Sequence, residues 1–316
     1  MPYKLIPFNQ EHLQPAVELF INAYREERFQ NPYLPSRVMN EPVWIQSALQ
    51  AKLSNPGIAV VEQGKLLAFM VTGSQFTWKG QRAVIVPEYG HAEIIGRDQT
   101  LYQVMYQTLA KEWLKTNCHL HLIAHFSHNI LLKETLYQLG FGALVAERVR
   151  DLSPIDGVQY QKIKEEKDIS KLVDLHIEHI LYYSQSPIFI PRTIEHPSAL
   201  ADLQSHVQNE DVLFVAYEQG QPCAYLIVGK SPIGSEGFLL QNTNSAQVKS
   251  AYAQPEVRDK GIGTALLNHA IGWAKQKGFE RIFVEHETAN IPGGNFWRKY
   301  FTPYLYFSMR YIDTTL

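Results

Sequence analysis

The stretch that decides the fold reads Arg258-Asp259-Lys260-Gly261-Ile262-Gly263. An alternating run over residues 248–253 precedes it, and an amphipathic segment starts near residue 264. A strand, a turn with two glycines and a helix start together point several backbone N–H groups at one spot, where the helix N-terminus adds roughly half a positive charge. A Cβ at either glycine would stand between those groups and an anion. The stretch therefore predicts a cradle for a pyrophosphate.

The spacing of the glycines separates the known kinds of pyrophosphate site. A dinucleotide fold has G-x-G-x-x-G directly after its strand. Here Pro255 and three more residues come before the first glycine, and Leu266 holds the third glycine position. The Gly-Lys-Ser/Thr of a P-loop does not occur in this stretch either. A nucleotide-binding oxidoreductase is therefore disfavoured.

Arg-x-x-Gly-x-Gly after a strand and a proline resembles the acyl-CoA pyrophosphate site of the GCN5-related N-acetyltransferases, the GNAT family. The following segments come in the family's order: a strand over residues 281–286, then Asn290, a helix over 294–300 and a strand over 304–312. The resemblance covers about residues 155–316. It implies an α/β (α+β) fold in which helices flank a mixed, mostly antiparallel sheet.

The chain also repeats itself. Glu62-Gln63-Gly64 returns as Glu218-Gln219-Gly220, 156 positions later (218 − 62), and each triplet lies in a predicted hairpin. His125 with Asn129 returns as His286 with Asn290, 161 positions later. The conserved order and near-constant offset predict a duplicated fold. We expect two tandem GNAT-like domains, residues 1–152 and 153–316, with a turn-rich boundary near residues 152–157.

The two copies differ at the pyrophosphate cradle. Thr100 stands opposite Gly261 and Tyr102 opposite Gly263, although Arg97-Asp98 still matches Arg258-Asp259. Two side chains would fill the space that phosphates need. We therefore expect the N-terminal copy to be degenerate and unable to bind CoA.

Composition limits the remaining classes of function. The chain has 316 residues, 45% of them hydrophobic, and a net charge of −2, which argues against a nucleic-acid surface. Cys118 and Cys223 show no metal spacing and are expected to be buried thiols. The sequence begins without a secretory signal and holds no apolar run of about 20 residues. These features predict a cytoplasmic protein without a membrane or nucleic-acid partner, either a monomer or a homodimer.

The resemblance implies acetyl-CoA as cosubstrate. Backbone groups of residues 252–254 would hold the pantetheine arm, and one N–H there would polarise the thioester carbonyl. Asn290 would hydrogen-bond the pantetheine, cap the following helix, or do both. The predicted cofactor-binding residues are Tyr252, Ala253, Gln254, Val257, Arg258, Asp259, Lys260, Gly261, Ile262, Gly263, Thr264, Asn290 and Trp297.

The catalytic positions depart from the family pattern. Relatives carry a tyrosine seven residues after the asparagine, where it protonates the leaving thiolate, and this chain has Trp297 there. Tyr300, on the same helical face, is the candidate acid, although a thiolate can also leave without one. Glu285 and Glu287 share one strand face and are candidate bases that act through water.

Acceptor specificity is expected from the first helix of the C-terminal copy. His176, His179 and Tyr183 lie on one stripe of residues 171–183 and are the predicted substrate-binding residues. The loop that follows, residues 182–191, has few charges, which hints at an acceptor that is not strongly ionic. The histidines have no third partner at metal spacing, so no metal is predicted.

The sequence thus predicts transfer of an acetyl group to a primary amine of a small molecule, in preference to a peptide, by direct attack in the C-terminal domain. An alternative is a non-catalytic, acyl-CoA-binding regulatory protein, which Trp297 at the expected acid position would suit. Release of free CoA with a panel of amines separates the two.

Overall fold

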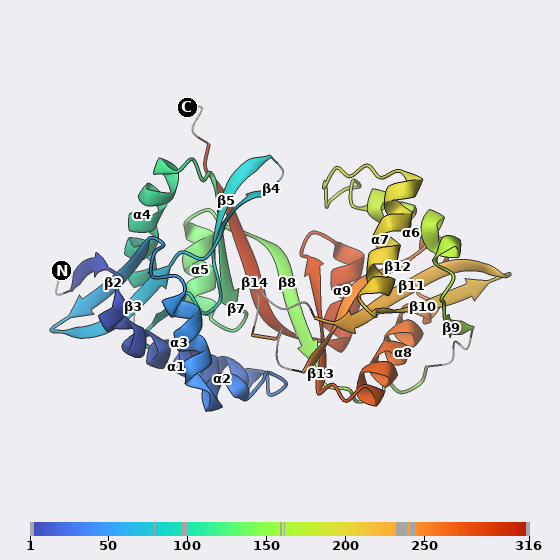
Figure 1. Cartoon of the computed structure of the whole chain (residues 1–316), viewed down its shortest axis with the longest axis horizontal. Helices are drawn as coiled ribbons and strands as arrows, with labels where there is room; N and C mark the ends of the chain where they lie inside the picture. Colours follow the sequence, from blue (N-terminus) through green and yellow to red (C-terminus); the bar gives the residue numbers. More distant parts are fainter. Residues whose placement is uncertain are drawn as a thin grey trace. The chain divides into compact units, whose positions relative to one another are not determined.

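The computed structural model describes residues 3–78, 80–96, 100–158, 160, 162–231, 239–240 and 244–313 (Figure 1). The chain divides into two compact units. Unit 1 comprises Met1–Glu147, Gly234–Thr243 and Pro303–Leu316, and unit 2 comprises Arg148–Ile233 and Asn244–Thr302. The division therefore falls after Glu147, five residues before the expected boundary at residue 152.

Unit 1 contains two sheets and five α-helices among the described residues. Its strands are β1 (Lys4–Pro7), β2 (Gly57–Glu62), β3 (Lys65–Val71), β4 (Gln75–Trp78), β5 (Gln81–Val86), β6 (His91–Glu93), β7 (Leu120–Phe126), β8 (Gly142–Arg150) and β14 (Thr302–Tyr311). Its helices are α1 (Leu13–Gln30), α2 (Arg37–Asn40), α3 (Pro42–Gln50), α4 (Thr100–Lys115) and α5 (Ile130–Gln138). One sheet has the order β1-β2-β3-β6, and the other strands follow the order β4-β5-β7-β14-β8.

The last strand of the chain belongs to unit 1. β14 pairs antiparallel with β7 from Leu305↔Phe126 to Tyr311↔Leu120. The backbone of Pro303 accepts a hydrogen bond from Asn31 Nδ2 at 3.1 Å, which ties the start of the strand to the residue that follows α1. This corrects the expectation that residues 304–312 complete the C-terminal domain.

Unit 2 is a single sheet with helices on both faces. Its strands follow the order β13-β12-β11-β10-β9, and only β12 and β13 run parallel. The strands are β9 (Ile163–Glu165), β10 (Val212–Glu218), β11 (Gln221–Lys230), β12 (Ser245–Ala253) and β13 (Arg281–Glu287). The helices are α6 (Val173–Tyr182), α7 (His196–Gln208), α8 (Ile262–Gln276) and α9 (Ile291–Tyr300).

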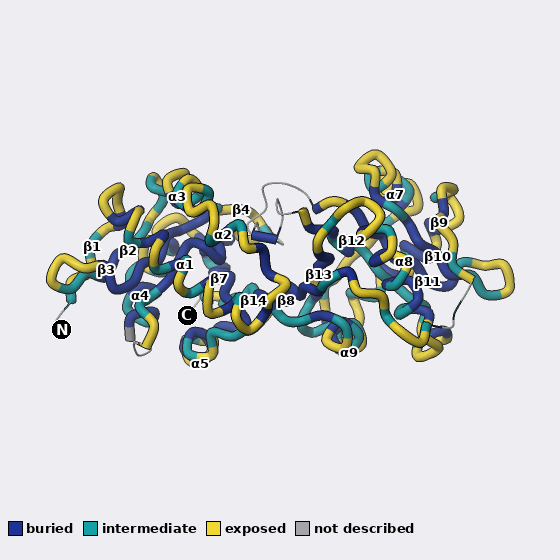
Figure 2. The backbone as a smooth tube through the Cα atoms, turned by 90° about the horizontal axis from the view of Figure 1, so that it is seen from below, coloured by how far each residue is buried: buried dark blue, intermediate teal, exposed yellow. Residues whose placement is uncertain are grey.

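Each face of this sheet has its own apolar core. The face under α8 buries residues such as Leu266, Ala270 and Ile282. The opposite face packs Leu175 of α6 and Leu203 of α7 against alternate residues of β10 and β11. Burial follows the strands and the inward faces of the helices, and the connecting loops are exposed (Figure 2).

The internal repeat of the sequence corresponds to a repeat of structure. β7 and β13 start 161 residues apart (281 − 120), and so do α5 and α9 (291 − 130). The two hairpins turn through the same left-handed pair of residues, Gln63-Gly64 with φ 50° and 80° and Gln219-Gly220 with φ 49° and 81°. These matched elements confirm that the fold is α/β with two similar halves.

Even the helix caps repeat. The side chain of Asn129 accepts a hydrogen bond from Leu132 N at 3.0 Å at the start of α5, and Asn290 accepts one from Gly293 N at 3.1 Å at the start of α9. An asparagine N-cap satisfies one of the four orphan N–H groups of a helix start. Both cysteines are buried and free, as expected. None of the described helices is both long and apolar enough to cross a membrane.

Candidate functional site

Two parallel strands of unit 2 separate partway along their length. The ladder between β12 and β13 joins Ser245–Val248 to Arg281–Val284, from Ser245↔Arg281 to Val248↔Val284. Both strands then continue, β12 to Ala253 and β13 to Glu287, but the described residues form no further pair between β12 and β13. The backbone groups of β12 that face this gap can therefore bind an extended ligand.

A β-bulge marks the point of separation. In the pairing of β11 with β12, Val228 faces Val248 and Ile227 faces Ser250, so Lys249 is the extra residue. A bulge breaks the strict alternation of side chains and re-aims them. As a result Lys249 and Ser250, although consecutive, both line one cavity on the α6 face.

The turn into α8 has the backbone that the glycine motif predicts. Asp259 and Gly261 adopt left-handed conformations, with φ 60° and φ 79°. α8 begins at Ile262, two residues before the expected start, and the first helical hydrogen bond runs from Ala265 N to the Gly261 carbonyl at 3.0 Å. No side chain caps this end within the described residues, so the amides of residues 262–264 remain available to an anion.

The second glycine of the motif also makes room for a neighbouring side chain. A Cβ on Gly263 would lie 3.2 Å from the ring of Phe296 in α9. The packing of α9 against the start of α8 is therefore a second reason for a small residue here, beside the predicted room for a phosphate. At Gly261 a Cβ would meet open space, so the positive φ is what favours glycine.

The side chain of Arg258 folds back onto its own strand. Its Nε donates to the Ala253 carbonyl at 3.0 Å, and its guanidinium lies over the rings of Tyr182 and Tyr252, 5.2 and 5.9 Å from the centroids. Arg258 therefore fixes the turn against β12, whereas the sequence suggested a direct phosphate contact. Lys260 is exposed at the turn.

The structure brings Asn290 and Tyr182 together. Tyr182 Oη donates to Asn290 Oδ1 at 3.1 Å, while the same oxygen caps α9. The Gln254 side chain reaches Glu178 at 3.0 Å, and its backbone N–H donates to the Cys223 carbonyl at 3.0 Å. Residues of α6 thus reach both the end of β12 and the start of α9.

Trp297 lies in the core of unit 2. It is 7% exposed and packs against Phe296 and Phe301. Contact between the indole and the cofactor stays a prediction. Three residues later, Tyr300 Oη lies 2.8 Å from Thr264 Oγ1 in the first turn of α8.

The two glutamates of β13 lie beyond the point where the ladder ends. The side chain of Glu285 is exposed, yet desolvation by surrounding protein raises its pKa, and the charge of Glu287 adds to the rise. An accessible but desolvated carboxyl is what the wall of a recess provides. Burial raises the pKa of Tyr183, and the charge of Glu287 adds to this effect, so Glu287 lies within electrostatic range of α6.

The predicted acceptor residues line a cavity of about 590 Å³ on the α6 face of the sheet. His176, His179 and Tyr183 form one wall. The loop residue Arg192, Asp202 of α7 and Lys249 of β12 contribute the charges. Charged side chains therefore line the cavity, and the expectation of an acceptor that is not strongly ionic, drawn from the loop at residues 182–191, stays a prediction.

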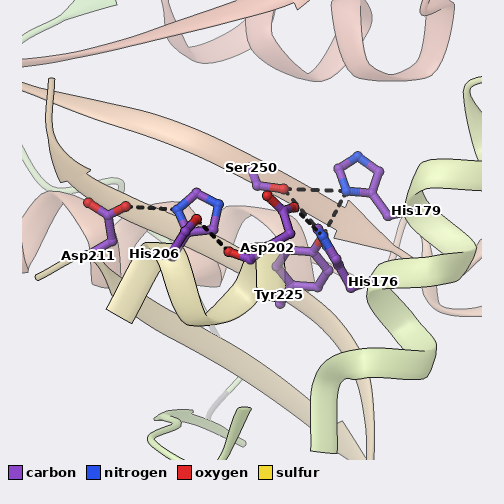
Figure 3. A network of polar contacts seen from close by, with 8 residues as sticks. His176, His179, Asp202, His206, Asp211, Tyr225 and Ser250 are labelled. Carbon is purple, nitrogen blue, oxygen red and sulfur yellow. Dashed lines mark hydrogen bonds and ion pairs between the residues drawn. The ribbon is translucent and has the colours of Figure 1, made fainter. Parts of the chain in front are cut away.

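Sequence reasoning missed the partners of these histidines. His176 Nε2 lies 2.7 Å from Asp202 Oδ2, and the Nδ1 atoms of His176 and His179 lie 2.8 and 2.7 Å from Tyr225 Oη (Figure 3). Lys249 Nζ and His206 Nδ1 both contact the buried carboxylate of Asp211, at 2.6 and 2.8 Å.

The sequence contains a signal for only one of these partners, Asp211. Gly229 interrupts an otherwise apolar strand because a Cβ there would lie 1.7 Å from Asp211 Oδ1. No group of acidic, histidine and cysteine side chains suited to a metal ion occurs in the described part of the chain.

The equivalent gap in unit 1 is filled by side chains. Met70 of unit 1 corresponds to Leu226 of unit 2, 156 residues later (226 − 70). Met70 pairs with His91, and Leu226 pairs with Ala251, so His91 is the equivalent of Ala251. His91 Nδ1 lies 3.1 Å from Tyr102 Oη, and its Nε2 lies 2.7 Å from the carbonyl of Ala124 in β7. Burial lowers the pKa of His91 to about 4, so the neutral ring donates to Ala124 and accepts from Tyr102.

Thus Ala251 and Gly263 of unit 2 correspond to the larger His91 and Tyr102 of unit 1, which bridge β6 to β7. The predicted remnant Arg97-Asp98 and the side chain of Thr100 lie outside the described residues.

Comparisons with known proteins agree with this geometry. Residues 179–301 match the family model described as Acetyltransferase (GNAT) family. Streptothricin acetyltransferase A of Bacillus subtilis is 28% identical over 109 residues, 34% of this chain and 60% of the relative. An uncharacterized N-acetyltransferase of Methanocaldococcus jannaschii is 31% identical over 71 residues, 22% of this chain and 30% of the relative. The matched stretches thus cover less than two thirds of either relative.

Solved structures resemble the fold over the whole chain. A GCN5-related N-acetyltransferase from Sphaerobacter thermophilus aligns with a TM-score of 0.61 at 12% identity, over 100% of this chain and 97% of that one. A tandem GNAT protein from the clavulanic acid biosynthesis pathway aligns with a TM-score of 0.50 at 13% identity, over 99% and 100%. Residues 179–301 therefore resemble the acetyltransferase (GNAT) family in sequence, and the whole chain shares the fold of these solved structures.

Proposed function

We propose that unit 2 binds acetyl-CoA in the gap between β12 and β13 and transfers its acetyl group to a primary amine of a small molecule. The observation that carries this proposal is the end of the parallel ladder at Val248↔Val284, next to a helix start whose amides have no side-chain cap among the described residues. The gap between the strands can hold an extended chain, and the uncapped helix start can bind an anionic group.

The residues around the gap suit the parts of CoA. The amides of residues 262–264 would hold the pyrophosphate, and the backbone of residues 252–254 would hydrogen-bond the pantetheine arm. One N–H of the same strand would polarise the thioester carbonyl. Asn290 would offer its amide to the arm while its oxygen continues to cap α9. The family uses acetyl-CoA as cosubstrate, and this arrangement supports the same assignment here.

Tyr300, Glu285 and Glu287 remain the candidate proton-transfer groups from the sequence. Tyr300 is held at the first turn of α8 by Thr264, and it would protonate the leaving thiolate. Desolvation raises the pKa of Glu285, and this residue is the base that the sequence suggests would act through water.

The cavity supports a small molecule as the acceptor. Its volume of about 590 Å³ falls within the roughly 300–1,000 Å³ of small-molecule pockets. Arg192 and Lys249 would bind anionic or hydroxyl groups of the acceptor. Streptothricin, which the Bacillus relative acetylates by its name, is a reasonable first acceptor to test.

The test is the release of free CoA from acetyl-CoA over a panel of amines that includes streptothricin, with mass spectrometry of the product. We expect one acetyl group to be added per CoA released. Gly261→Val with Gly263→Val should abolish both turnover and CoA binding. Tight CoA binding without turnover on any amine would instead favour the regulatory, non-catalytic alternative.

A further inference from the structure

A chain of polar side chains crosses unit 2 from its surface to β12 (Figure 3). It begins at Asp202, whose side chain is 50% exposed, and passes to His176, which is 4% exposed. From there it reaches Tyr225 Oη and then His179 Nδ1, in steps of 2.7, 2.8 and 2.7 Å. Ser250 Oγ lies 3.3 Å from Tyr225 Oη, at the strand position that follows the bulge.

The number of protons in this chain determines their positions. Tyr225 Oη has one hydrogen but two imidazole nitrogens as neighbours, so one of the two rings must donate to it. His176 Nε2 faces the Asp202 carboxylate and must carry a hydrogen. Because burial lowers the pKa of His176, its ring is neutral, and its bare Nδ1 accepts from Tyr225.

His179 Nδ1 has two neighbours, Tyr225 Oη at 2.7 Å and Ser250 Oγ at 3.4 Å. The shorter contact assigns the Nδ1–H of His179 to Tyr225, which leaves a lone pair on Nε2. This nitrogen has no hydrogen-bond partner among the described residues, and Figure 3 shows it pointing away from the network. His179 lines the cavity and stacks on Tyr252 at 5.1 Å between ring centroids. Tyr252 belongs to the part of β12 that faces the open gap.

We propose that His179 Nε2 is the base that takes the proton from the acceptor amine, and that Tyr225 and His176 relay the charge to Asp202. This proposal rests on the proposed function of unit 2. It adds a catalytic residue, His179, which sequence reasoning placed only in substrate binding.

The relay is balanced at each atom. As the amine nitrogen bonds to the acetyl carbon, its proton moves to His179 Nε2, and the Nδ1 proton of His179 moves to Tyr225 Oη. The former Tyr225 proton moves to His176 Nδ1, and the Nε2 proton of His176 moves to Asp202 Oδ2. The amide product and the CoA thiolate then leave. The four transfers run in reverse from Asp202, and His179 Nε2 gives the proton to water in the emptied cavity, so each group regains its starting hydrogen.

The burial of His179 favours relay of the proton to Asp202 over its storage on the His179 ring. Desolvation lowers the pKa of His179 to about 3, with further lowering by the charges of His176 and Arg192, so an imidazolium there is short-lived. Transfer of the second ring proton to Tyr225 keeps His179 neutral during the step. Neither histidine needs to hold a charge in the buried region.

Two conservative substitutions test the relay, and each has a matched control. Asp202→Asn keeps an acceptor for His176 but not a proton sink, and Tyr225→Phe removes the central hydroxyl. Asp174→Asn, at an exposed position on α6, and Tyr160→Phe, which loses one hydrogen bond to the Tyr217 carbonyl, are the controls.

We expect kcat of both relay variants to fall about a hundredfold, the lower end of what positioned proton transfer contributes. The KM for acetyl-CoA and the Kd of CoA by calorimetry should stay within about twofold, because neither residue belongs to the proposed CoA site. In mixtures of H₂O and D₂O, the wild type should show a curved dependence of rate on deuterium content, which indicates several protons in flight, and Asp202→Asn should lose the curvature.

Unchanged kcat in Asp202→Asn would overturn the relay and leave the proposed function intact. A linear deuterium dependence in the wild type would do the same. Absence of turnover in the wild type on every amine would contradict both the proposed acetyl transfer and the relay. If Tyr225→Phe fails to fold, as shown by loss of CoA binding, Asp202→Asn decides the matter alone, because its exposed side chain makes misfolding no explanation for a lost rate.

Discussion

Single residues of the glycine motif serve different physical needs, although they look alike in the sequence. Gly261 provides the left-handed turn, with φ 79°, and Gly263 makes room for Phe296. Only the first is a local property that neighbours in the sequence dictate. The second depends on a helix that starts 28 residues later (291 − 263).

Gly263→Ala should reduce the free energy of unfolding of unit 2. The added Cβ would lie 3.2 Å from the Phe296 ring, and overpacking of this kind costs about 1–3 kcal/mol. Gly272→Ala is the matched control, because its Cβ meets nothing within 4 Å in the same helix. There the change should stabilise by about 0.4–1 kcal/mol. Urea unfolding measures both, and equal effects would contradict the packing account.

Removal of the Tyr300 hydroxyl tests whether this single residue is the catalytic acid. If Tyr300 protonates the leaving thiolate, Tyr300→Phe should lower kcat by about a hundredfold, the lower end of what positioned proton transfer contributes. The loss of one hydrogen bond to Thr264 should cost only about 1 kcal/mol of stability. An unchanged kcat would remove Tyr300 from the mechanism, and steady-state kinetics with a good acceptor decides this.

At the scale of elements, β14 shows how a strand can serve a distant part of the chain. It lies beside β7 in unit 1, while α9, directly before it, belongs to unit 2. Tyr304 is fully buried, and its carbonyl accepts from Ser127 N at 2.8 Å. A strand at this place gives β7 its second partner, which explains why all seven residues of β7 are buried.

Truncation of the chain after Thr302 should destabilise unit 1 rather than the unit that carries the glycine motif. β7 would lose its antiparallel ladder to β14 and expose its backbone N–H and C=O groups. We expect the early thermal transition of the truncated protein to involve unit 1, detected by hydrogen exchange of residues 120–126. A chain cut after Ile312, which retains all of β14, should melt like the full-length protein.

The whole molecule is a duplication in which one half has kept the open gap. In unit 1, His91 and Tyr102 bridge the strands that diverge in unit 2, and both side chains are buried. Ala251 and Gly263 leave that space free in unit 2. Two substitutions from small to large thus distinguish a filled copy from an open one, and they support the proposal that unit 1 does not bind CoA.

Isothermal titration should therefore find one CoA per chain. Gly261→Val with Gly263→Val, which obstructs the turn and the packing of α9 in unit 2, should reduce the number of sites to zero. A stoichiometry of two, or one site that survives the double variant, would show that unit 1 binds CoA despite the bridging side chains.

Unit 1 should lose stability in acid. Burial lowers the pKa of His91, His121 and His125 to about 4 each, below the ordinary value of 6.5. Between these values the unfolded chain binds more protons than the folded one, so stability is complete above pH 6.5 and is lost as the pH falls toward 4. Each histidine contributes about 1.4 kcal/mol per pH unit within that window.

Urea unfolding of the full chain at pH 7.5 and pH 5 measures this loss. The transition of unit 1 should move to lower urea at pH 5. Burial raises the pKa of Glu27, so below its folded pKa the folded protein binds this proton more tightly than the unfolded chain does. Glu27 therefore gains stability as the pH falls and partly offsets the loss from the histidines. A midpoint independent of pH would show that these histidines are already protonated in the folded protein.

The sequence alone determined whatever depends on neighbours along the chain. The hairpin turns, the helix start after Gly261 and the cap by Asn290 all follow from local spacing, and the structure confirms them. The repeat also followed from the sequence, because a near-constant offset needs no knowledge of contacts.

Only the tertiary structure decided which distant residues meet. Asp202, Tyr225 and Ser250 come from a helix and two strands, and no spacing connects them to His179. The burial of Trp297, the placement of β14 in unit 1 and the pairing of His91 with Tyr102 are of the same kind. Local pattern constrains backbone conformation, whereas side-chain contacts between elements depend on how the sheets bring those elements together.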